Sequence, residues 1–177
     1  MHISMEIWNA IFVVASVITL VACPVFVVNW FRYMKIARAL PPAEKWANFP
    51  VKSVAFFMIP ILVTDVVALI LTSSARMQVL DQLHALSGNY EVYVEGHTYR
   101  ESEKIISMIK QVSPYLAHHS HPTKMIRITI RGPQATIALE LGRDSGRPQE
   151  YWVFYPGNVV TSRNEIGRVT TSLLDQY

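Results

Sequence analysis

Residues 54–71 read VAFFMIPILVTDVVALIL, and Asp65 is the only one of these eighteen residues that carries a charge. The others are apolar, proline or threonine. Residues 7–31 contain no charge at all. At about 1.5 Å per helical residue, either segment with its flanks can cross a hydrocarbon core roughly 30 Å thick. The sequence therefore predicts two transmembrane helices, at about 8–30 and 53–73.

The residues argue against two other interpretations of these segments, a buried core helix and a cleaved signal peptide. A buried core helix normally keeps a polar stripe, and residues 7–31 have none. A cleaved signal peptide needs a basic leader, but MHISME has no Lys or Arg. No small-residue cleavage site precedes the basic stretch FRYMKIARAL. We therefore expect a retained two-span membrane anchor over residues 1–75, in a chain that is 51% hydrophobic.

The distribution of basic residues predicts the orientation of this anchor. The connector 31–52 holds five of them, Arg32, Lys35, Arg38, Lys45 and Lys52. Arg76 is the only basic residue in the first dozen positions after the second span. The positive-inside rule places the connector in the cytoplasm and both termini outside. The expected location is the inner membrane of a bacterium, multi-pass, with residues 76–177 in the periplasm.

The net charge of +3 belongs mostly to the connector, since residues 74–177 hold 11 Lys and Arg against 10 Asp and Glu. A nucleic-acid reader needs a basic patch on the folded domain itself, so we expect membrane and protein partners and no nucleic acid. The only cysteine, Cys23, lies in the first predicted span, which excludes an intramolecular disulfide.

Residues 76–177 predict a small α+β domain with a mainly antiparallel sheet and two to three helices. The second span continues as a helix to a stop near Gly88, and YEVYVEG (90–96) alternates like a strand. A capping box at 98–101 opens a helix that closes before Pro114. A three-strand meander follows, built from MIRITIR (125–131), QATIALEL (134–141) and EYWVFYP (150–156). A second box at 162–165 predicts a C-terminal helix.

Asp65 is the first candidate for function, because a charged carboxylate at mid-bilayer costs about 2.5–3.5 kcal/mol on insertion scales. Matching the centres of the two spans places it level with Ser16, one turn from Thr19 and beside Thr64. We expect Asp65 to face a helix interface rather than lipid. Three roles are open: an internal hydrogen bond, contact with another membrane protein, or ion movement through a homo-oligomer.

The cluster AHHSHP supplies His118, His119 and His121, which suggests zinc or copper as an alternative to having no cofactor. Adjacent histidines of an extended segment point apart, and no Cys, Asp or Glu lies within five residues to complete a ligand set. A polar loop is the simpler interpretation.

The loop GRDSGRP (142–148) and the neighbouring strands suggest a surface for a partner. Glycines and arginines can cradle a phosphate or an acidic side chain, although a strand-connecting turn explains the same residues. Arg and Trp side chains dominate binding hot spots. The candidate partner-binding residues are Arg127, Arg131, Arg143, Arg147 and Trp152.

The sequence contains no GxSxG, no HExxH and no cysteine in the outer domain, so we expect a non-enzymatic interaction protein. Small anchored proteins of this layout include immunity proteins, which neutralise a toxin acting at the membrane or in the periplasm, and this is the function we expect. The alternatives are an accessory subunit of an envelope complex and a metal-dependent enzyme or sensor using the three histidines.

Overall fold

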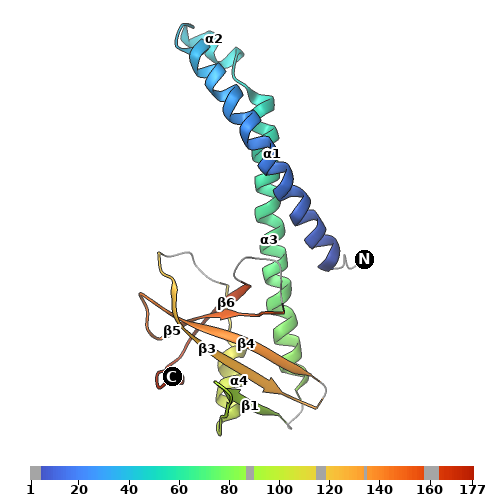
Figure 1. The fold of residues 1–177 in the computed structure, drawn as a ribbon, viewed down its shortest axis with the longest axis vertical. Coiled ribbons are helices and arrows are strands. Elements are labelled where there is room, and N and C mark those ends of the chain that lie inside the picture. Colours follow the sequence, from blue (N-terminus) through green and yellow to red (C-terminus); the bar gives the residue numbers. More distant parts are fainter. Residues whose placement is uncertain (1–4, 87–89, 115–118, 134, 158–163) are drawn as a thin grey trace. The chain divides into compact units, whose positions relative to one another are not determined.

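The computed structural model describes residues 5–86, 90–114, 119–133, 135–157 and 164–177 (Figure 1). The fold is α+β, with two long apolar helices followed by a six-stranded antiparallel sheet. The chain divides into two compact units, Met1–Leu71 and Thr72–Tyr177. The sequence placed this boundary four residues later, between 75 and 76.

The first unit contains α1 (Met5–Ala37), α2 (Pro42–Ala47) and the first part of α3 (Val51–Ala85). Within the described residues, α1 and α3 are both long and apolar enough to cross a membrane. Large apolar side chains are exposed along both of them, with Leu20 exposed by 77% and Leu62 by 65%. A helix with apolar side chains on its exposed surface is unusual in a soluble core, where the outer face is normally polar.

The connector between the long helices differs in detail from the predicted one. The predicted connector begins at residue 31, but α1 continues as far as Ala37. The connector also contains a short helix, α2, which begins at Pro42. Proline is favoured in the first helical turn, where its missing N–H leaves no hydrogen bond unmade.

Aromatic rings gather where α1 and α3 approach the connector. Phe26 stacks on Phe57 with 4.8 Å between ring centroids, and Phe49 lies 5.5 Å from Tyr33. Asn29 on α1 donates a hydrogen bond from Nδ2 to Ser53 Oγ on α3, at 2.9 Å. These contacts join the two helices at the end that carries the basic connector.

The second unit is built on one sheet whose strands lie in the order β2-β1-β3-β4-β5-β6, each antiparallel to its neighbours. Three of these strands confirm the predicted meander, and β1 confirms the strand predicted after Gly88. The strand bounds are β1 Glu91–Val94, β2 His97–Thr98, β3 Pro122–Arg131, β4 Thr136–Asp144, β5 Glu150–Phe154 and β6 Glu165–Thr170.

Helices cover one face of this sheet. The last turns of α3 and all of α4 (Ser102–Lys110) contribute to the same buried core as the strands. Side chains alternate across a strand, so the isoleucines of β3 and the aliphatic residues of β4 fall on the helix side. The buried set includes Val79, Leu83, Ile105, Ile109, Ile126, Ile128, Ile130, Ile137, Leu139 and Leu141.

The predicted C-terminal helix is wrong, because the described part of that segment, Glu165–Thr170, forms strand β6. Ser162, the proposed cap, lies outside the described residues. Glycine weakens a helix interior, and β-branched residues favour strands, so the local sequence GRVTT already opposed the helix. Pairing with β5 supplies the hydrogen bonds that the helix would have made.

The first predicted capping box is also wrong in its position. Thr98 belongs to β2, where it pairs with Tyr93, and α4 begins only at Ser102. The predicted helix itself is confirmed, with Ile105, Ile106 and Ile109 buried. A two-residue strand is too short to leave a periodic signal in the sequence.

A substitution at Gly167 tests how closely β6 packs on Val112 and Ser113, which follow α4. The φ of Gly167 is +153°, and an added Cβ would lie 2.9 Å from Val112 Cγ2 and still closer to the Ser113 carbonyl oxygen. We expect Gly167→Ala to lower the free energy of unfolding by about 3 kcal/mol through backbone strain and overpacking. Gly146→Ala is the control, because its Cβ meets ordinary contacts at 3.5 Å. Near-equal denaturation midpoints for the two variants, measured by circular dichroism in detergent, would contradict this packing.

Candidate functional site

The face of the sheet opposite α4 carries polar and charged side chains on β1, β3 and β4. Strand register places them on one side, since Tyr93 pairs with Thr129, Arg127 with Glu140, and Thr129 with Ala138. Among the residues that the structure describes, this face has no covering helix. We call it the open face and define it as Glu91, Tyr93, Met125, Arg127, Thr129, Arg131, Ala138 and Glu140.

Weak pairs between opposite charges and rings cross the open face. Arg127 leaves 71% of its side chain exposed and lies 3.9 Å from Glu140. Arg131 stacks over the Tyr93 ring, with 4.8 Å from its guanidinium carbon to the ring centroid. The hydroxyl of Tyr93 donates to Glu91 at 2.6 Å, and this hydrogen bond raises the pKa of Tyr93. Exposed pairs of this kind contribute little to stability, so these groups can exchange their contacts for those of a partner.

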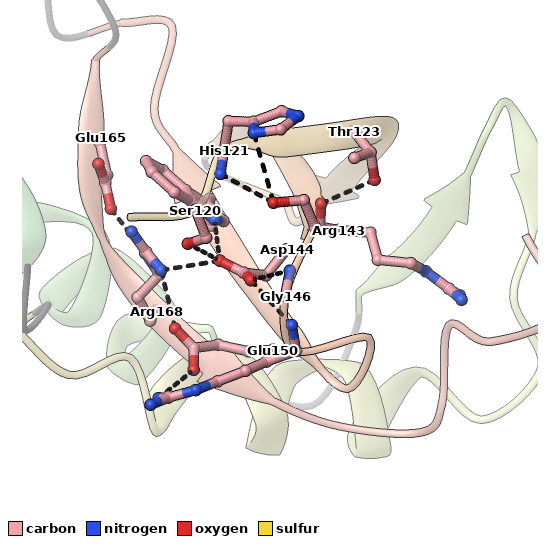
Figure 2. A network of polar contacts seen from close by, with 12 residues as sticks. Ser120, His121, Thr123, Arg143, Asp144, Gly146, Glu150, Glu165 and Arg168 are labelled. Atoms are coloured by element: carbon pink, nitrogen blue, oxygen red, sulfur yellow. Dashed lines mark hydrogen bonds and ion pairs between the residues drawn. The ribbon is translucent and has the colours of Figure 1, made fainter. Parts of the chain in front are cut away.

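A buried polar network lies on the same side of the sheet, over β4, β5 and β6 (Figure 2). Its centre is Asp144, at the end of β4, whose side chain is completely buried. Asp144 Oδ2 accepts hydrogen bonds from Ser120 Oγ at 2.5 Å and Trp152 Nε1 at 2.8 Å. Its other oxygen, Oδ1, accepts the backbone N–H groups of Gly146 and Arg147, at 2.8 and 2.9 Å.

These donors decide the protonation of Asp144. Burial alone would raise the pKa of a carboxyl group, because it penalises the charged form. The hydrogen bonds from Ser120, Trp152 and the two backbone N–H groups outweigh burial and hold the pKa of Asp144 far below its usual range. The carboxylate is therefore ionised at neutral pH and serves as an acceptor rather than as a proton donor.

Arg168 on β6 joins the carboxylates of three different segments. Its Nη1 lies 2.8 Å from Glu150 Oε1 and 3.3 Å from Asp144 Oδ2, and its Nε donates to Glu165 Oε1 at 2.9 Å. The guanidinium also lies 3.4 Å from the centroid of the Trp152 ring, within the range of a cation–π interaction. These contacts clamp β4, β5, β6 and the segment before β3 to one another.

Ser145 and His121 come together at the edge of this network. Ser145 Oγ lies 3.4 Å from His121 Nδ1, and the His121 backbone N–H donates to the same oxygen at 3.1 Å. A catalytic serine needs a base that a third group orients. The nearby carboxylate, Asp144, is bonded to Ser120 instead and points into the domain, so the contacts described here do not form such a triad.

The loop GRDSGRP is a strand-connecting turn between β4 and β5. The N–H groups of Gly146 and Arg147, which a bound phosphate would need, are already bonded to Asp144. The Arg147 side chain is exposed and paired with Glu150 at 3.2 Å. The turn interpretation therefore explains this loop, and the anion-cradle alternative has no free backbone donors at these two positions.

Of the five predicted partner-binding residues, Trp152 is buried and Arg143 is partly buried. Trp152 is only 4% exposed and packs beneath Arg168. Arg143 stacks over Tyr151 and donates to the Leu174 carbonyl at 3.1 Å. Strand pairing thus turns the Trp152 and Arg143 side chains toward contacts within the domain, which leaves Trp152 little surface for a partner. The other three, Arg127, Arg131 and Arg147, are exposed.

The histidine cluster is only partly described. His118 lies outside the described residues, and His119 and His121 are exposed. Within the described ranges, no three or more His, Cys, Asp or Glu side chains are grouped so that they could hold a metal ion.

The polar residues of the apolar helices do not form the internal bond considered for Asp65. Ser16 Oγ donates to the Phe12 carbonyl at 2.8 Å, Thr19 Oγ1 to Ala15 at 2.9 Å, and Thr64 Oγ1 to Pro60 at 2.8 Å. Each hydroxyl thus bonds the backbone of its own helix. Asp65 is exposed, with no hydrogen bond or ion pair to any described residue.

The sequence did not identify every residue of the open face or the buried network. The sequence pattern indicates Tyr93 and Met125 only as members of strands, and it predicts a helix for the segment that holds Arg168. Alternation along YEVYVEG places Tyr93 on the opposite face from Val92 and Val94, and this pattern could have identified Tyr93 as a residue of the open face. The meeting of Asp144 with Arg168 depends on long-range strand pairing and left no local signal.

Asp144→Asn tests the network, because it removes the charge while keeping the side-chain size. We expect a loss of about 3 kcal/mol in the free energy of unfolding, since Arg168 loses a buried carboxylate. Ionised Asp144 stabilises the fold above its ordinary pKa of 3.8, and this contribution fades as pH falls toward its lowered folded pKa. The difference in the free energy of unfolding between wild type and Asp144→Asn should therefore become smaller below about pH 4.

Glu140→Gln is the matched control, an exposed carboxylate for which we expect a change within about 0.5 kcal/mol. Urea unfolding of the full chain at several pH values measures both variants. Equal stability of Asp144→Asn and wild type at neutral pH would show that the Asp144–Arg168 contact does not stabilise the domain.

No protein-family model matches the chain, and no match to it was found among curated proteins or solved structures. Its function therefore has to be inferred from its own residues and their geometry.

Proposed function

We propose that the chain is a membrane-anchored, non-enzymatic protein that binds a partner protein with the open face of its sheet domain. In this proposal α1 and α3 cross a bacterial inner membrane, the connector lies in the cytoplasm, and the sheet domain lies in the periplasm. The exposed, charged and aromatic open face is the observation that carries the binding function.

Three features support the membrane crossing. The exposed apolar surface extends along both long helices, from Ile7 on α1 to Leu69 on α3. The aromatic rings at one end suit the headgroup region, where Trp and Tyr are enriched, and Trp46 exposes 80% of its surface there. The basic connector is at that same end and would meet anionic lipid on the cytoplasmic side.

The open face supports binding because the weak contacts among its exposed charged and aromatic side chains contribute little to the stability of the domain. Its guanidinium groups and its Tyr93 ring are residue types that dominate binding hot spots, and Met125 is 45% exposed beside them. Two carboxylates, Glu91 and Glu140, and two guanidinium groups, Arg127 and Arg131, lie on it. A partner with a matching charge pattern could replace each weak pair with a contact of its own.

Two kinds of partner suit an anchored domain of this layout. One is a toxin that acts at the membrane or in the periplasm, which would make the chain an immunity protein. The other is a subunit of an envelope complex, which would make it an accessory subunit. Either partner would bind to the open face. Expression of a candidate toxin distinguishes the two roles, because only an immunity protein should let the cells survive.

A photo-crosslinking amino acid at Ala138, in the centre of the open face, tests the proposal in living cells. We expect a discrete adduct with one periplasmic or membrane protein, and loss of this adduct on Arg127→Glu, which reverses a charge that is 71% exposed. Arg127→Glu should leave the fold intact, because an exposed pair contributes little stability.

The control is the same crosslinker at Ser107, which is exposed on α4, on the other side of the sheet. Equal adducts from both positions, or an adduct at Ala138 that survives Arg127→Glu, would show that the open face is not the binding surface.

A further inference from the structure

Asp65 stands in the middle of an exposed apolar stripe on α3. Leu62, three residues before it, exposes 65% of its surface, and Leu69, four residues after it, exposes 69%. Met58, two turns before Asp65, exposes 52%. Residues three and four apart share a helix face, so the carboxylate lies on a face that α1 leaves uncovered.

The position of Asp65 between the two ends of the apolar part of α3 gives its depth in the proposed membrane. Ser53 is bonded to Asn29 beside the aromatic rings, and Asp65 lies twelve residues further along α3, or about 18 Å. The core of the sheet domain takes up α3 from Ala75 onward. If α3 crosses the membrane as proposed above, Asp65 is therefore close to the middle of the hydrocarbon layer.

The chain's own polar groups near that depth do not bond to this carboxylate. The hydroxyls of Ser16, Thr19 and Thr64 donate to carbonyls of their own helices. Intramembrane ionisable residues normally face a partner group or a water-filled cavity, because lipid cannot solvate their charge. Asp65 therefore needs a donor that the described part of this chain does not present to it.

A second copy of the chain could not supply a cation either. Residues 7–31 and 53–75 contain no Lys, Arg or His, so a second copy offers only another Asp65 at the same depth. Charge complementarity thus favours a helix from a different protein.

We propose that the Asp65 face of α3 binds a membrane-spanning helix of another protein, one that carries an Arg or Lys at mid-bilayer depth. The cation would pair with the carboxylate, while apolar side chains of that helix pack on Leu62, Leu69 and Met58. This inference rests on the proposed membrane crossing and adds an intramembrane partner to it. It does not depend on the open face of the sheet domain.

The test uses the full chain in vesicles of phosphatidylcholine and phosphatidylglycerol. Cys23, the only cysteine, is exposed on α1 and carries a fluorescent donor. The probes are three synthetic transmembrane peptides of leucine and alanine, each with an acceptor and with Arg, Gln or Leu at its centre. Energy transfer at rising peptide concentration gives the affinity for each one.

We expect the Arg peptide to bind at least about tenfold more tightly than the Leu peptide, which corresponds to about 1.4 kcal/mol. Asp65→Asn should reduce binding of the Arg peptide to the level of the Gln peptide. Asp65→Glu, which keeps the charge on the same face, should restore most of the preference. Equal binding of the three peptides by wild type would overturn the proposal, and so would a preference that survives Asp65→Asn.

Two further results separate this inference from the proposed function. A chain that alkaline carbonate extracts from the vesicles contradicts the membrane crossing itself, and the intramembrane pairing with it. A chain that stays inserted without preferring the Arg peptide contradicts only the pairing. Strong transfer between donor-labelled and acceptor-labelled copies of the chain, lost on Asp65→Asn, would identify a second copy as the occupant and overturn the proposal.

Discussion

Helix α3 has to suit two different surroundings along one continuous run of 35 residues, and the rest of the structure depends on this. As far as Leu69 it exposes large apolar side chains on its outer surface. Its buried residues fall four apart from Val67 to Leu83, but from Arg76 onward most residues between them are polar or charged, with Met77 and Leu80 as the apolar exceptions. The first pattern suits lipid and the second suits a water-soluble core, so the change in pattern marks the end of the proposed span.

The two faces of the sheet differ: one holds the core, and the other carries the proposed binding surface. The helix side holds the aliphatic core of the domain. On the opposite side, Asp144 and Arg168 tie the last three strands together with charge, since breaking a buried pair of this kind is costly. The core and the Asp144–Arg168 contacts stabilise the domain. The exposed residues of the open face are therefore not needed for folding and can serve to bind a partner.

Local patterns in the sequence predicted most of the fold, and long-range pairing accounts for most of what they missed. Hydrophobic runs and alternation located the long helices and the strands of the meander, because both depend on neighbouring residues. Strand β6 was mistaken for a helix because Ile166 and Val169 fit a helical spacing, while Gly167 and its pairing with β5 decided otherwise. Of the candidate sites, Arg127 and Arg131 were predictable from alternation, but the burial of Trp152 was not, since Arg168 covers it from a strand 16 residues away.

The central claim is that α3 passes from lipid to periplasm shortly after Leu69, and cysteine labelling tests it most directly. Single cysteines are placed in a Cys23→Ser background and exposed to a membrane-impermeant maleimide in intact spheroplasts. The account predicts labelling at Gln78 and Asp81, which are exposed on α3, and none at Leu62 or Leu69. A cysteine at Ala43 in the connector should react only after permeabilisation. Labelling at Leu62 or Leu69, or at Ala43 in intact spheroplasts, would contradict the account.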